Sequence, residues 1–575
     1  MYTKIRNVQY IISMMKAYGV KNIVLSAGTR HVAIAESVEN DSFFNCYSVV
    51  DERSAGYFAI GLAKELNEPV AIACTSSTAT CNYYPAVAEA YYQSIPLLIL
   101  TGDRNPYLLD QMEDQMIDQV GMYSNVCKRC ASLPIVRTDE DAWYCQRLLN
   151  EAMAELRYGP VHINFPVIQT VREMTDTSEV QLPSVRKIEH IKAGDNNWKD
   201  YVEKLKNYKK ILIIGGLCSE IEAMKIGPAL SAFAKKYPCA IAAEQTSNCM
   251  VPKAYKFNPS FTLTMTDDAF DEVAPDLVIT FGGNFINGLK EILRRRPFSC
   301  DHWLIDSRDR VCDSLKNLSV VFCCEPAYFF ENMLGIQNSQ NDMKYIEQWK
   351  KIENSITPIQ APWSSYHVIE KLAKSMPENT LVHLGILNST RIMGLFDLPE
   401  SVSVYSNLGT DGIDGSMSTF FGQMAVSKKK LGILVLGDLS FFYDMNSVGI
   451  NCIDSRCRIL LLNNGGAAEF HFTMGRDKLP NIDLHIAAAH QKTAENWVKA
   501  CGFQYLQATD ASSYEIALKR FLDPNHKGPV FLEIFTDKEV DAKILHEHYD
   551  NNVVFSSVER SKSKIKSVLS KLRGK

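Results

Sequence analysis

The chain has 575 residues, of which 46% are hydrophobic and 22% charged, and its formal net charge is −5. This apolar fraction is ordinary for a globular protein and excludes disordered and collagen-like classes. A protein that binds nucleic acid by neutralising phosphates normally carries a basic domain, which the main body lacks, so we expect no nucleic-acid partner. At roughly 150 residues per domain, the length predicts three or four domains and is typical of a large enzyme.

The N-terminal segment and the cysteines indicate a cytoplasmic location. Residues 1–20 lack the apolar core and the small-residue cleavage site of a signal peptide. No run of about 18 apolar residues occurs, so we expect no membrane span. Sixteen cysteines without a secretion signal are typical of reduced thiols. Cys127 and Cys130 form a Cys-x-x-Cys without a second pair at zinc-ribbon distance, which favours small hydrophobic roles over a metal or redox pair.

In chain order, three blocks of α/β pattern follow one another, at 1–185, 199–345 and 365–545. In each block, strand-like apolar runs alternate with helical patterns, which predicts doubly wound parallel sheets with helices on both faces. The expected strands are 22–26, 46–50, 70–74, 96–101 and 160–165 in block one, 210–214, 240–243, 276–281, 302–305 and 320–324 in block two, and 380–384, 401–405, 431–436, 458–462 and 529–535 in block three. Gly215-Gly216 in block two lacks the G-x-G-x-x-G spacing of a dinucleotide site.

The last segment, 551–575, differs in charge from the rest of the chain. It holds seven lysine and arginine residues against one acid, Glu559. Apolar residues at helical spacing accompany them. We expect a basic C-terminal tail that is either a solvated helix or a contact for an anionic surface or partner.

The strongest motif lies in block three, where polar residues follow two expected strands. Gly437-Asp438 ends the strand 431–436, and 26 residues later Asn464 ends the strand 458–462. Ligands of open parallel sheets bind at the carboxyl ends of strands. A carboxylate and an amide oxygen are hard ligands that suit Mg²⁺ or Ca²⁺ together with a diphosphate. The alternative is a pair of ordinary strand-ending turns.

This Gly-Asp and Asn-Asn pattern resembles the signature of thiamine diphosphate (ThDP) enzymes. The resemblance implies pyrimidine-binding (PYR), central Rossmann-like and diphosphate-binding (PP) domains for the three blocks. It implies that Asp438 and Asn464 bind Mg²⁺ (or Ca²⁺ or Mn²⁺) by side chain and Gly466 by its carbonyl. The cofactor-binding residues it implies are Gly412, Ile413, Gly437, Leu439, Ser440, Ala467 and Phe470.

The same resemblance assigns a catalytic glutamate to block one. A ThDP enzyme needs one protected carboxylate at the cofactor's aminopyrimidine, on a different domain from the diphosphate site. Glu52, in Asp51-Glu-Arg-Ser-Ala55 just after the strand 46–50, matches it. Taken alone, a glutamate is nearly always a solvated surface residue.

Further motifs resemble the SEPHCHC synthase family of menaquinone biosynthesis, whose reaction joins 2-oxoglutarate to isochorismate. They include Ser26-Ala-Gly-Thr-Arg30, Leu100-Thr-Gly-Asp-Arg104, Asp114-Gln-Met-Ile-Asp-Gln119 and Gly412-Ile-Asp-Gly415. The substrate-binding residues implied for the acceptor are Thr29, Arg30, Arg104 and Gln115, and those implied for the donor side are Arg391 and, from the central domain, Lys290. The resemblance also implies a homodimer as the smallest assembly and a homotetramer, formed by two such dimers, as the larger one. The active sites would lie between block one of one subunit and block three of another.

The chain departs from this family's pattern in the donor pocket. Leu408 stands where the family has a carboxylate-binding arginine, and Leu387 where it has a serine that serves the diphosphate. Glu469 stands where an apolar residue is usual, and Ser77 replaces a glycine. A lost cation and a gained carboxylate disfavour an anionic donor, so we expect the donor or the acceptor to differ. Glu469 is either a catalytic acid–base or a residue that caps its helix or turns away.

The residues and the resemblance together predict a Mg²⁺- and ThDP-dependent transferase of the transketolase type. It decarboxylates a 2-oxo acid and adds the acyl carbanion to a polar acceptor. The alternatives within enzymes are a simple 2-oxo acid decarboxylase (a carboxy-lyase) and an acetolactate-synthase-like carboligase. A further alternative, from another class, is a non-catalytic ThDP-binding or scaffold protein.

Overall fold

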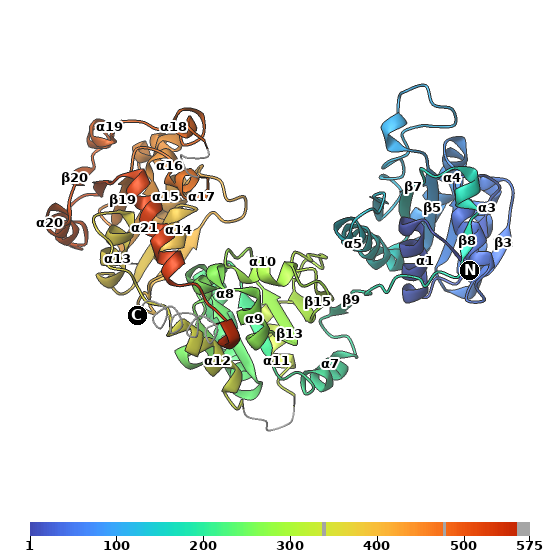
Figure 1. The fold of residues 1–575 in the computed structure, drawn as a ribbon, viewed down its shortest axis with the longest axis horizontal. Helices are drawn as coiled ribbons and strands as arrows, with labels where there is room; N and C mark the ends of the chain where they lie inside the picture. The colour runs from blue at the N-terminus through green and yellow to red at the C-terminus, as the bar shows by residue number, and fades with distance from the viewer. Residues whose placement is uncertain (336–340, 430, 475–478, 560–575) are drawn as a thin grey trace, which may run out of the picture. The chain divides into compact units, whose positions relative to one another are not determined.

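The computed structural model describes residues 1–335, 341–429, 431–474 and 479–559 (Figure 1). The chain divides into two compact units, Met1–His190 with Asp309–Val321, and Ile191–Arg308 with Phe322–Lys575. Most of the expected basic tail, residues 560–575, lies outside the described residues. Within the described ranges, no helix combines the length and the apolar character needed to cross a membrane.

The first unit is built on a six-stranded parallel sheet with the order β3-β2-β4-β5-β7-β6. The five strands expected here are confirmed, and the edge strand β6 is additional. The strands are β2 (Asn22–Leu25), β3 (Asn45–Ser48), β4 (Val70–Cys74), β5 (Leu97–Asp103), β6 (Arg129–Ser132) and β7 (Val161–Pro166). Its helices are α1 (Arg6–Tyr18), α2 (Val32–Glu39), α3 (Glu52–Leu66), α4 (Thr78–Tyr92), α5 (Asp139–Glu155) and α6 (Val171–Met174), and the short strands β1 (Tyr2–Thr3) and β8 (Thr177–Ser178) pair separately.

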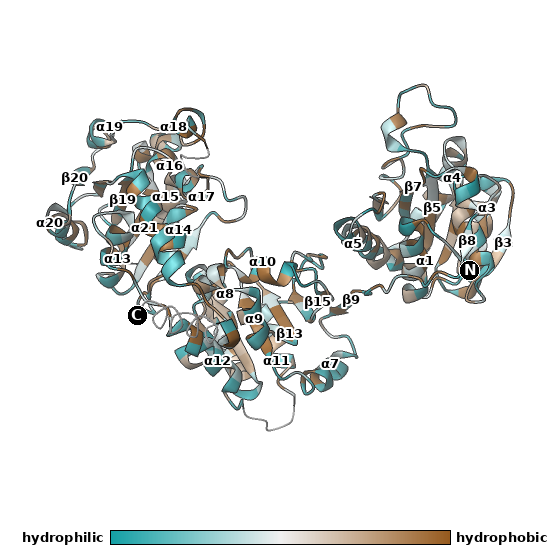
Figure 2. Ribbon diagram, in the orientation of Figure 1, coloured by the Kyte–Doolittle hydropathy of each residue, from teal (hydrophilic) through white to brown (hydrophobic). Residues whose placement is uncertain are grey.

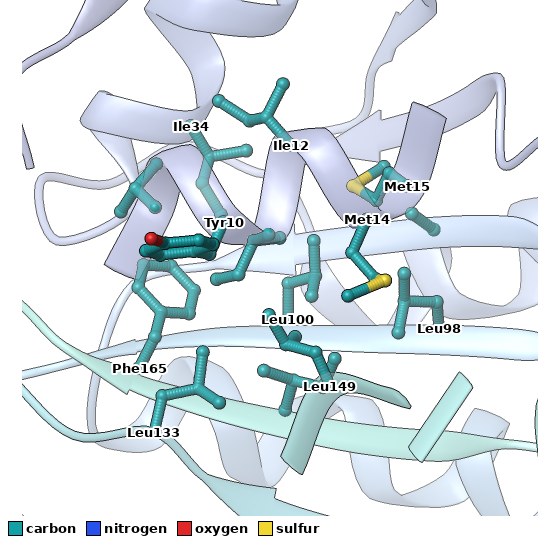
Figure 3. Packing of buried hydrophobic residues seen from close by; sticks show 14 of the residues in the cluster. Tyr10, Ile12, Met14, Met15, Ile34, Leu98, Leu100, Leu133, Leu149 and Phe165 are labelled. Atoms are coloured by element: carbon teal, nitrogen blue, oxygen red, sulfur yellow. The ribbon is translucent and has the colours of Figure 1, made fainter. Parts of the chain in front are cut away.

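Helices cover both faces of this sheet because its strands are apolar on both sides. Leu98 and Leu100 of β5 pack into one core with α1, α2 and α5 (Figure 3). Leu97 and Ile99, on the alternate positions, pack into a second core with α3 and α4. The doubly wound arrangement predicted from the alternation of elements follows from this period of two.

The second unit contains a central sheet and a C-terminal sheet. The central sheet has parallel strands in the order β12-β11-β10-β13-β14, followed by β15 and β9. Two of the boundaries between the units fall within β9 and β15. Its strands are β9 (Glu189–Lys192), β10 (Ile211–Gly215), β11 (Cys239–Ala243), β12 (Lys256–Phe257), β13 (Leu277–Phe281), β14 (Asp301–Ile305) and β15 (Leu318–Cys323). Its helices are α7 (Trp198–Leu205), α8 (Glu220–Lys236), α9 (Asp267–Val273), α10 (Leu289–Arg294), α11 (Pro326–Asn332) and α12 (Lys344–Glu353).

The C-terminal sheet is parallel throughout, with the order β17-β16-β18-β19-β21-β20. Figure 2 shows the hydrophobic colouring of the buried strand β13 of the central sheet. The strands are β16 (Thr380–Leu384), β17 (Ser403–Ser406), β18 (Leu431–Gly437), β19 (Cys457–Asn463), β20 (Gln504–Ala508) and β21 (Val530–Phe535). The helices are α13 (Ser365–Lys374), α14 (Asn388–Met393), α15 (Ser416–Val426), α16 (Asp438–Tyr443), α17 (Ala468–Thr473), α18 (Ile482–His485), α19 (Glu495–Ala500), α20 (Ala511–Phe521) and α21 (Lys538–Asn551). The predicted α/β class with doubly wound parallel sheets is confirmed.

One departure from the family pattern leaves the backbone strained. Ser77, at the N-terminal end of α4, has φ 72° and ψ −130°, a conformation that favours glycine. Its N–H is fixed there by the Oε1 atom of Gln119, 3.1 Å away. Such a conformation costs a residue with a side chain on the order of 1–3 kcal/mol.

We therefore expect Ser77→Gly to raise the free energy of unfolding of the first unit by about 1 kcal/mol, because the relieved strain exceeds the added chain entropy. Urea denaturation of the two proteins measures the difference. Ser76→Gly is the matched control, since Ser76 lies outside the positive-φ residues and its Oγ donates to the Gln115 carbonyl at 3.0 Å. The control is expected to lose stability, and a Ser77→Gly variant that also lost stability would contradict the assigned strain.

Candidate functional site

In the first unit, Glu52 lies at the carboxyl edge of the sheet. Strand β3 ends at Ser48, and Asp51 caps α3 by accepting a hydrogen bond from the Ser54 N–H at 2.8 Å. Glu52 is the first residue of that helix and is half-buried. Its Oε2 atom accepts a hydrogen bond from Asn82 of α4 at 3.1 Å. The cap and this bond fix the direction of the carboxylate that the sequence singled out.

Arg30 and Arg104, expected to bind the acceptor, lie close to each other at the same edge. A Cβ atom on Gly102, near the end of β5, would come within 2.6 Å of the Arg30 carbonyl, so only glycine allows the two segments to meet. Burial, and then the charge of Arg104, lowers the pKa of Arg30. Arg104 is itself held by Glu113 at 2.8 Å and Asp114 at 3.1 Å. Arg30 and Arg104 thus place two positive charges at this edge of the sheet, and Glu113 and Asp114 partly neutralise them.

The other two acceptor residues lie on loops of this edge with exposed side chains. Thr29 follows β2. Gln115 has φ 52° and accepts a bond from Ser76 through its carbonyl oxygen, not its side chain. Gln119 appears in the sequence analysis only as part of a motif and was not predicted as a site residue. Its buried amide donates to Asn164 at 2.7 Å and to the Gly102 carbonyl at 3.2 Å. It holds the loop after β5 against the sheet.

In the second unit, the ends of β18 and β19 meet at Asp438. Its Oδ2 atom accepts hydrogen bonds from the N–H groups of Gly465 at 2.8 Å and Gly466 at 3.0 Å. The N–H of Leu439 binds its Oδ1 atom at 2.7 Å. A Cβ on Gly466, where φ is 144°, would lie 2.7 Å from the Ala487 carbonyl. Both glycines therefore allow a close approach of backbone to a buried carboxylate.

Asn464 is oriented by a residue that the sequence did not indicate. Its Nδ2 atom donates to Oδ2 of Asp541 at 3.0 Å, which leaves the Oδ1 atom for another partner. Asp541, in the first turn of α21, also accepts bonds from the Ser365 N–H at 2.7 Å and from its hydroxyl at 2.6 Å. Burial raises the pKa of the Asp541 carboxyl, against these bonds. No short motif connects Asp541 to Asn464, which lies 77 residues earlier in the chain.

The remaining cofactor candidates lie around this point. Ser440 donates its hydroxyl to the carbonyl of Ile413 at 2.7 Å, which joins the loop containing Gly412 to the start of α16. Ala467 and Phe470 lie at the start of α17, directly after the glycine pair. His490 was also missed, and its Nε2 atom is 3.3 Å from Oδ2 of Asp438.

These residues suit a divalent cation and a diphosphate. The site offers a buried carboxylate and an amide oxygen, which are hard ligands. A Cβ on Gly437 would meet no atom within 4 Å, so there is open space beside the carboxylate.

Two predicted donor-side residues line one cavity in this unit. Lys290 and Arg391 are among the residues around a cavity of about 380 Å³ between the central and C-terminal sheets. Arg391 forms a two-point ion pair with Glu469, through Nη1 and, at 3.2 Å, through Nη2. Glu469, in the first turn of α17, directs its carboxylate to Arg391. Leu408 is buried, with 1% of its surface exposed, and its carbonyl accepts a bond from Asn284.

The family described as "Thiamine pyrophosphate enzyme, N-terminal TPP binding domain" matches residues 5–122. A 2-succinyl-5-enolpyruvyl-6-hydroxy-3-cyclohexene-1-carboxylate synthase (SEPHCHC synthase) of Bacteroides fragilis is 35% identical over 562 residues, 96% of this chain and 99% of its own length. The chain belongs to the SEPHCHC synthase family. Synthases of the same name from Flavobacterium johnsoniae and Porphyromonas gingivalis are 32% and 28% identical, each over 95% of this chain and over 99% and 97% of their own lengths. The match to the thiamine pyrophosphate enzyme model makes this family member a thiamine diphosphate enzyme.

We expect Asp541→Asn to weaken the binding of Mg²⁺ in the presence of ThDP about tenfold, because asparagine offers one acceptor oxygen for the four hydrogen bonds that Asp541 accepts, and the Asn464 amide is then less firmly oriented. The measurement is a thermal-shift titration of Mg²⁺ at fixed ThDP, referred to the melting temperature of each protein without ligand. Asp550→Asn, an exposed position at the end of the same helix, is the control. Equal Mg²⁺ affinities of the two variants would contradict the orienting role.

Proposed function

We propose that this family member is a metal- and ThDP-dependent enzyme that decarboxylates a 2-oxo acid and transfers the acyl unit to an anionic acceptor. The observation that carries the proposal is the junction of two neighbouring strand ends at Asp438, beside the oriented amide of Asn464. Mg²⁺ is the cation proposed, because the ligands offered are hard oxygens. When bound, ThDP supplies a nucleophilic carbanion and an electron sink for the carboxylate that leaves as carbon dioxide.

The chain's own residues would bind, orient and transfer protons. Asp438, Asn464 and the Gly466 carbonyl would hold the cation. Glu52 would hold a proton at the ring nitrogen of the cofactor's aminopyrimidine through one carboxylate oxygen. Arg30 and Arg104 would bind the carboxylate of the acceptor, since guanidinium groups match carboxylates at two points.

The relatives' name supports acyl transfer over simple decarboxylation. It describes the product of those proteins as a succinyl group on a cyclohexene carboxylate. One observation favours the alternative of a 2-oxo acid decarboxylase or of a different carboligase. Arg104 and Arg391, which would bind substrate, are each paired with carboxylates of the chain. Carbon dioxide release from a panel of 2-oxo acids, with and without isochorismate, separates these functions.

We also propose a homodimer that buries part of the first unit. Beside Glu52, helices α3 and α4 carry large exposed apolar side chains, which mark a contact surface when they gather. They are Tyr57 (45% exposed), Phe58 (43%), Tyr84 (36%) and Tyr92 (83%). A partner subunit on this surface would shield the Glu52 carboxylate from water.

Replacement of the proposed proton-holding residue should separate binding from chemistry. In Glu52→Gln, we expect carbon dioxide release to fall at least 100-fold, because an amide cannot exchange the proton. Stabilisation by ThDP and Mg²⁺ should persist, at about 2.7 kcal/mol when the ligand is 100-fold above its Kd. Turnover at the wild-type rate would refute the role of Glu52. Saturable ligand binding without release from any 2-oxo acid by the wild-type chain would favour the scaffold alternative.

A charge on the α3 surface should disrupt the proposed dimer. We expect Phe58→Asp to weaken dimerisation at least tenfold, because an unpaired carboxylate would be buried at the contact. Sedimentation velocity over a range of concentrations measures this. Ile516→Asp, an exposed apolar position on α20 that is 68% exposed, is the control and should leave the mass unchanged. A dimer of unchanged affinity in both variants would place the contact elsewhere.

A further inference from the structure

The guanidinium group of Arg391 makes three hydrogen bonds to the chain's own side chains. Two of its nitrogen atoms bind the two carboxylate oxygens of Glu469, and Nη1 also donates to Asn388 at 2.8 Å. The ring of Phe472 lies beneath it, 5.3 Å from the guanidinium carbon. The side chains of Arg391 and Glu469 are only 21% and 13% exposed. Burial opposes the charge, but the bonds from Glu469 raise the pKa of Arg391.

This ion pair connects the proposed metal site to the cavity. Glu469 follows Gly466 by three residues, on the helix that begins after the glycine pair. Arg391 lines the cavity, together with Asp411. Asp411 lies two residues before Ile413, whose carbonyl is bound by Ser440 of α16. A substrate that reached the proposed cofactor site through this cavity would therefore pass the ion pair.

The charges around the cavity do not favour an anion. Its cations are Lys290 and Arg391, and its carboxylates are Glu244, Glu291 and Asp411. Glu469 cancels one of the two cations. The ammonium of Lys290 donates to Asn284 and lies 4.7 Å from the centre of the Phe285 ring.

The Glu244 carboxyl is buried in the wall, and burial raises its pKa. Its Oε1 atom accepts two bonds, from the Ile286 N–H at 2.9 Å and from Asn287 at 2.8 Å. Its Oε2 atom is buried without a hydrogen-bond partner. The rest of the wall includes apolar side chains, namely Leu263, Phe285, Ile286, Leu384 and Leu387.

We infer that Glu469 determines donor specificity by occupying Arg391, so that the cavity accepts a 2-oxo acid with a short, uncharged side chain and discriminates against one with a second carboxylate. A second carboxylate would have to displace Glu469 and leave it unpaired beside the incoming charge. Leu408, buried on the neighbouring loop, supplies no cation in compensation. This inference rests on the proposed 2-oxo acid chemistry and names the class of donor.

The test measures donor binding without turnover. In the Glu52→Gln background, loaded with ThDP and Mg²⁺, the Kd values of pyruvate and 2-oxoglutarate are measured by titration calorimetry. We expect pyruvate to bind at least tenfold more tightly. Adding Glu469→Ala should tighten 2-oxoglutarate binding at least tenfold and change pyruvate binding less than twofold, because Arg391 is released. Glu469→Gln, which keeps the shape of the side chain, should shift the ratio in the same direction.

The matched control is Glu495→Gln, which removes a first-turn carboxylate that pairs with Lys499 at 2.6 Å on the surface helix α19. It should leave both Kd values unchanged, and thermal melting checks that every variant is folded. Preference of the Glu52→Gln protein for 2-oxoglutarate, equal binding or non-binding of both acids, or no response to either Glu469 substitution would overturn the inference. Failure of the proposed function is a separate outcome, in which the chain with Glu52 intact binds these acids but releases carbon dioxide from none.

Discussion

The carboxylate of Asp438 is the constraint on which the candidate site depends. It ends β18 and binds two backbone N–H groups that follow β19, so the two strand ends cannot move independently. These N–H groups are available only because Gly465 and Gly466 adopt positive φ angles, and at Gly466 a side chain would strike the backbone of Ala487. Buried carboxylates must be hydrogen-bonded or neutralised, and a divalent cation would complete what the backbone begins.

The residues that contact Asp438 and Asn464 come from distant parts of the chain. Asp541 on α21 holds the Asn464 amide, and His490 faces Asp438 from the loop that also closes over Gly465. Side chains of this kind fix the direction in which a metal ligand points. Helix α21 is therefore part of the proposed site, although it contains none of the expected ligands.

Much of the fold and part of the candidate site were predictable from sequence, for reasons that differ by element. Buried parallel strands such as β4 and β18 read as continuous apolar runs, and the motifs at their ends mark the site edge. The edge strands β6 and β20 were missed because one side of each is exposed and the apolar run is broken. Contacts such as that between Arg391 and Glu469 join residues 78 positions apart, and no local pattern predicts a partner at that separation.

That ion pair also changes what the departures from the family pattern mean together. Considered singly, Leu408 removes a cation and Glu469 adds an anion, and each would leave an unbalanced group near the donor. In the structure, Leu408 is buried as a core residue and Glu469 is neutralised by Arg391. The two substitutions compensate in charge only if no second carboxylate competes for Arg391. Because a buried ion pair is costly to break but tolerable when complete, the resting protein is stable in a form that disfavours a dianionic donor. Specificity at such a site is set by the chain's own carboxylate before any substrate arrives.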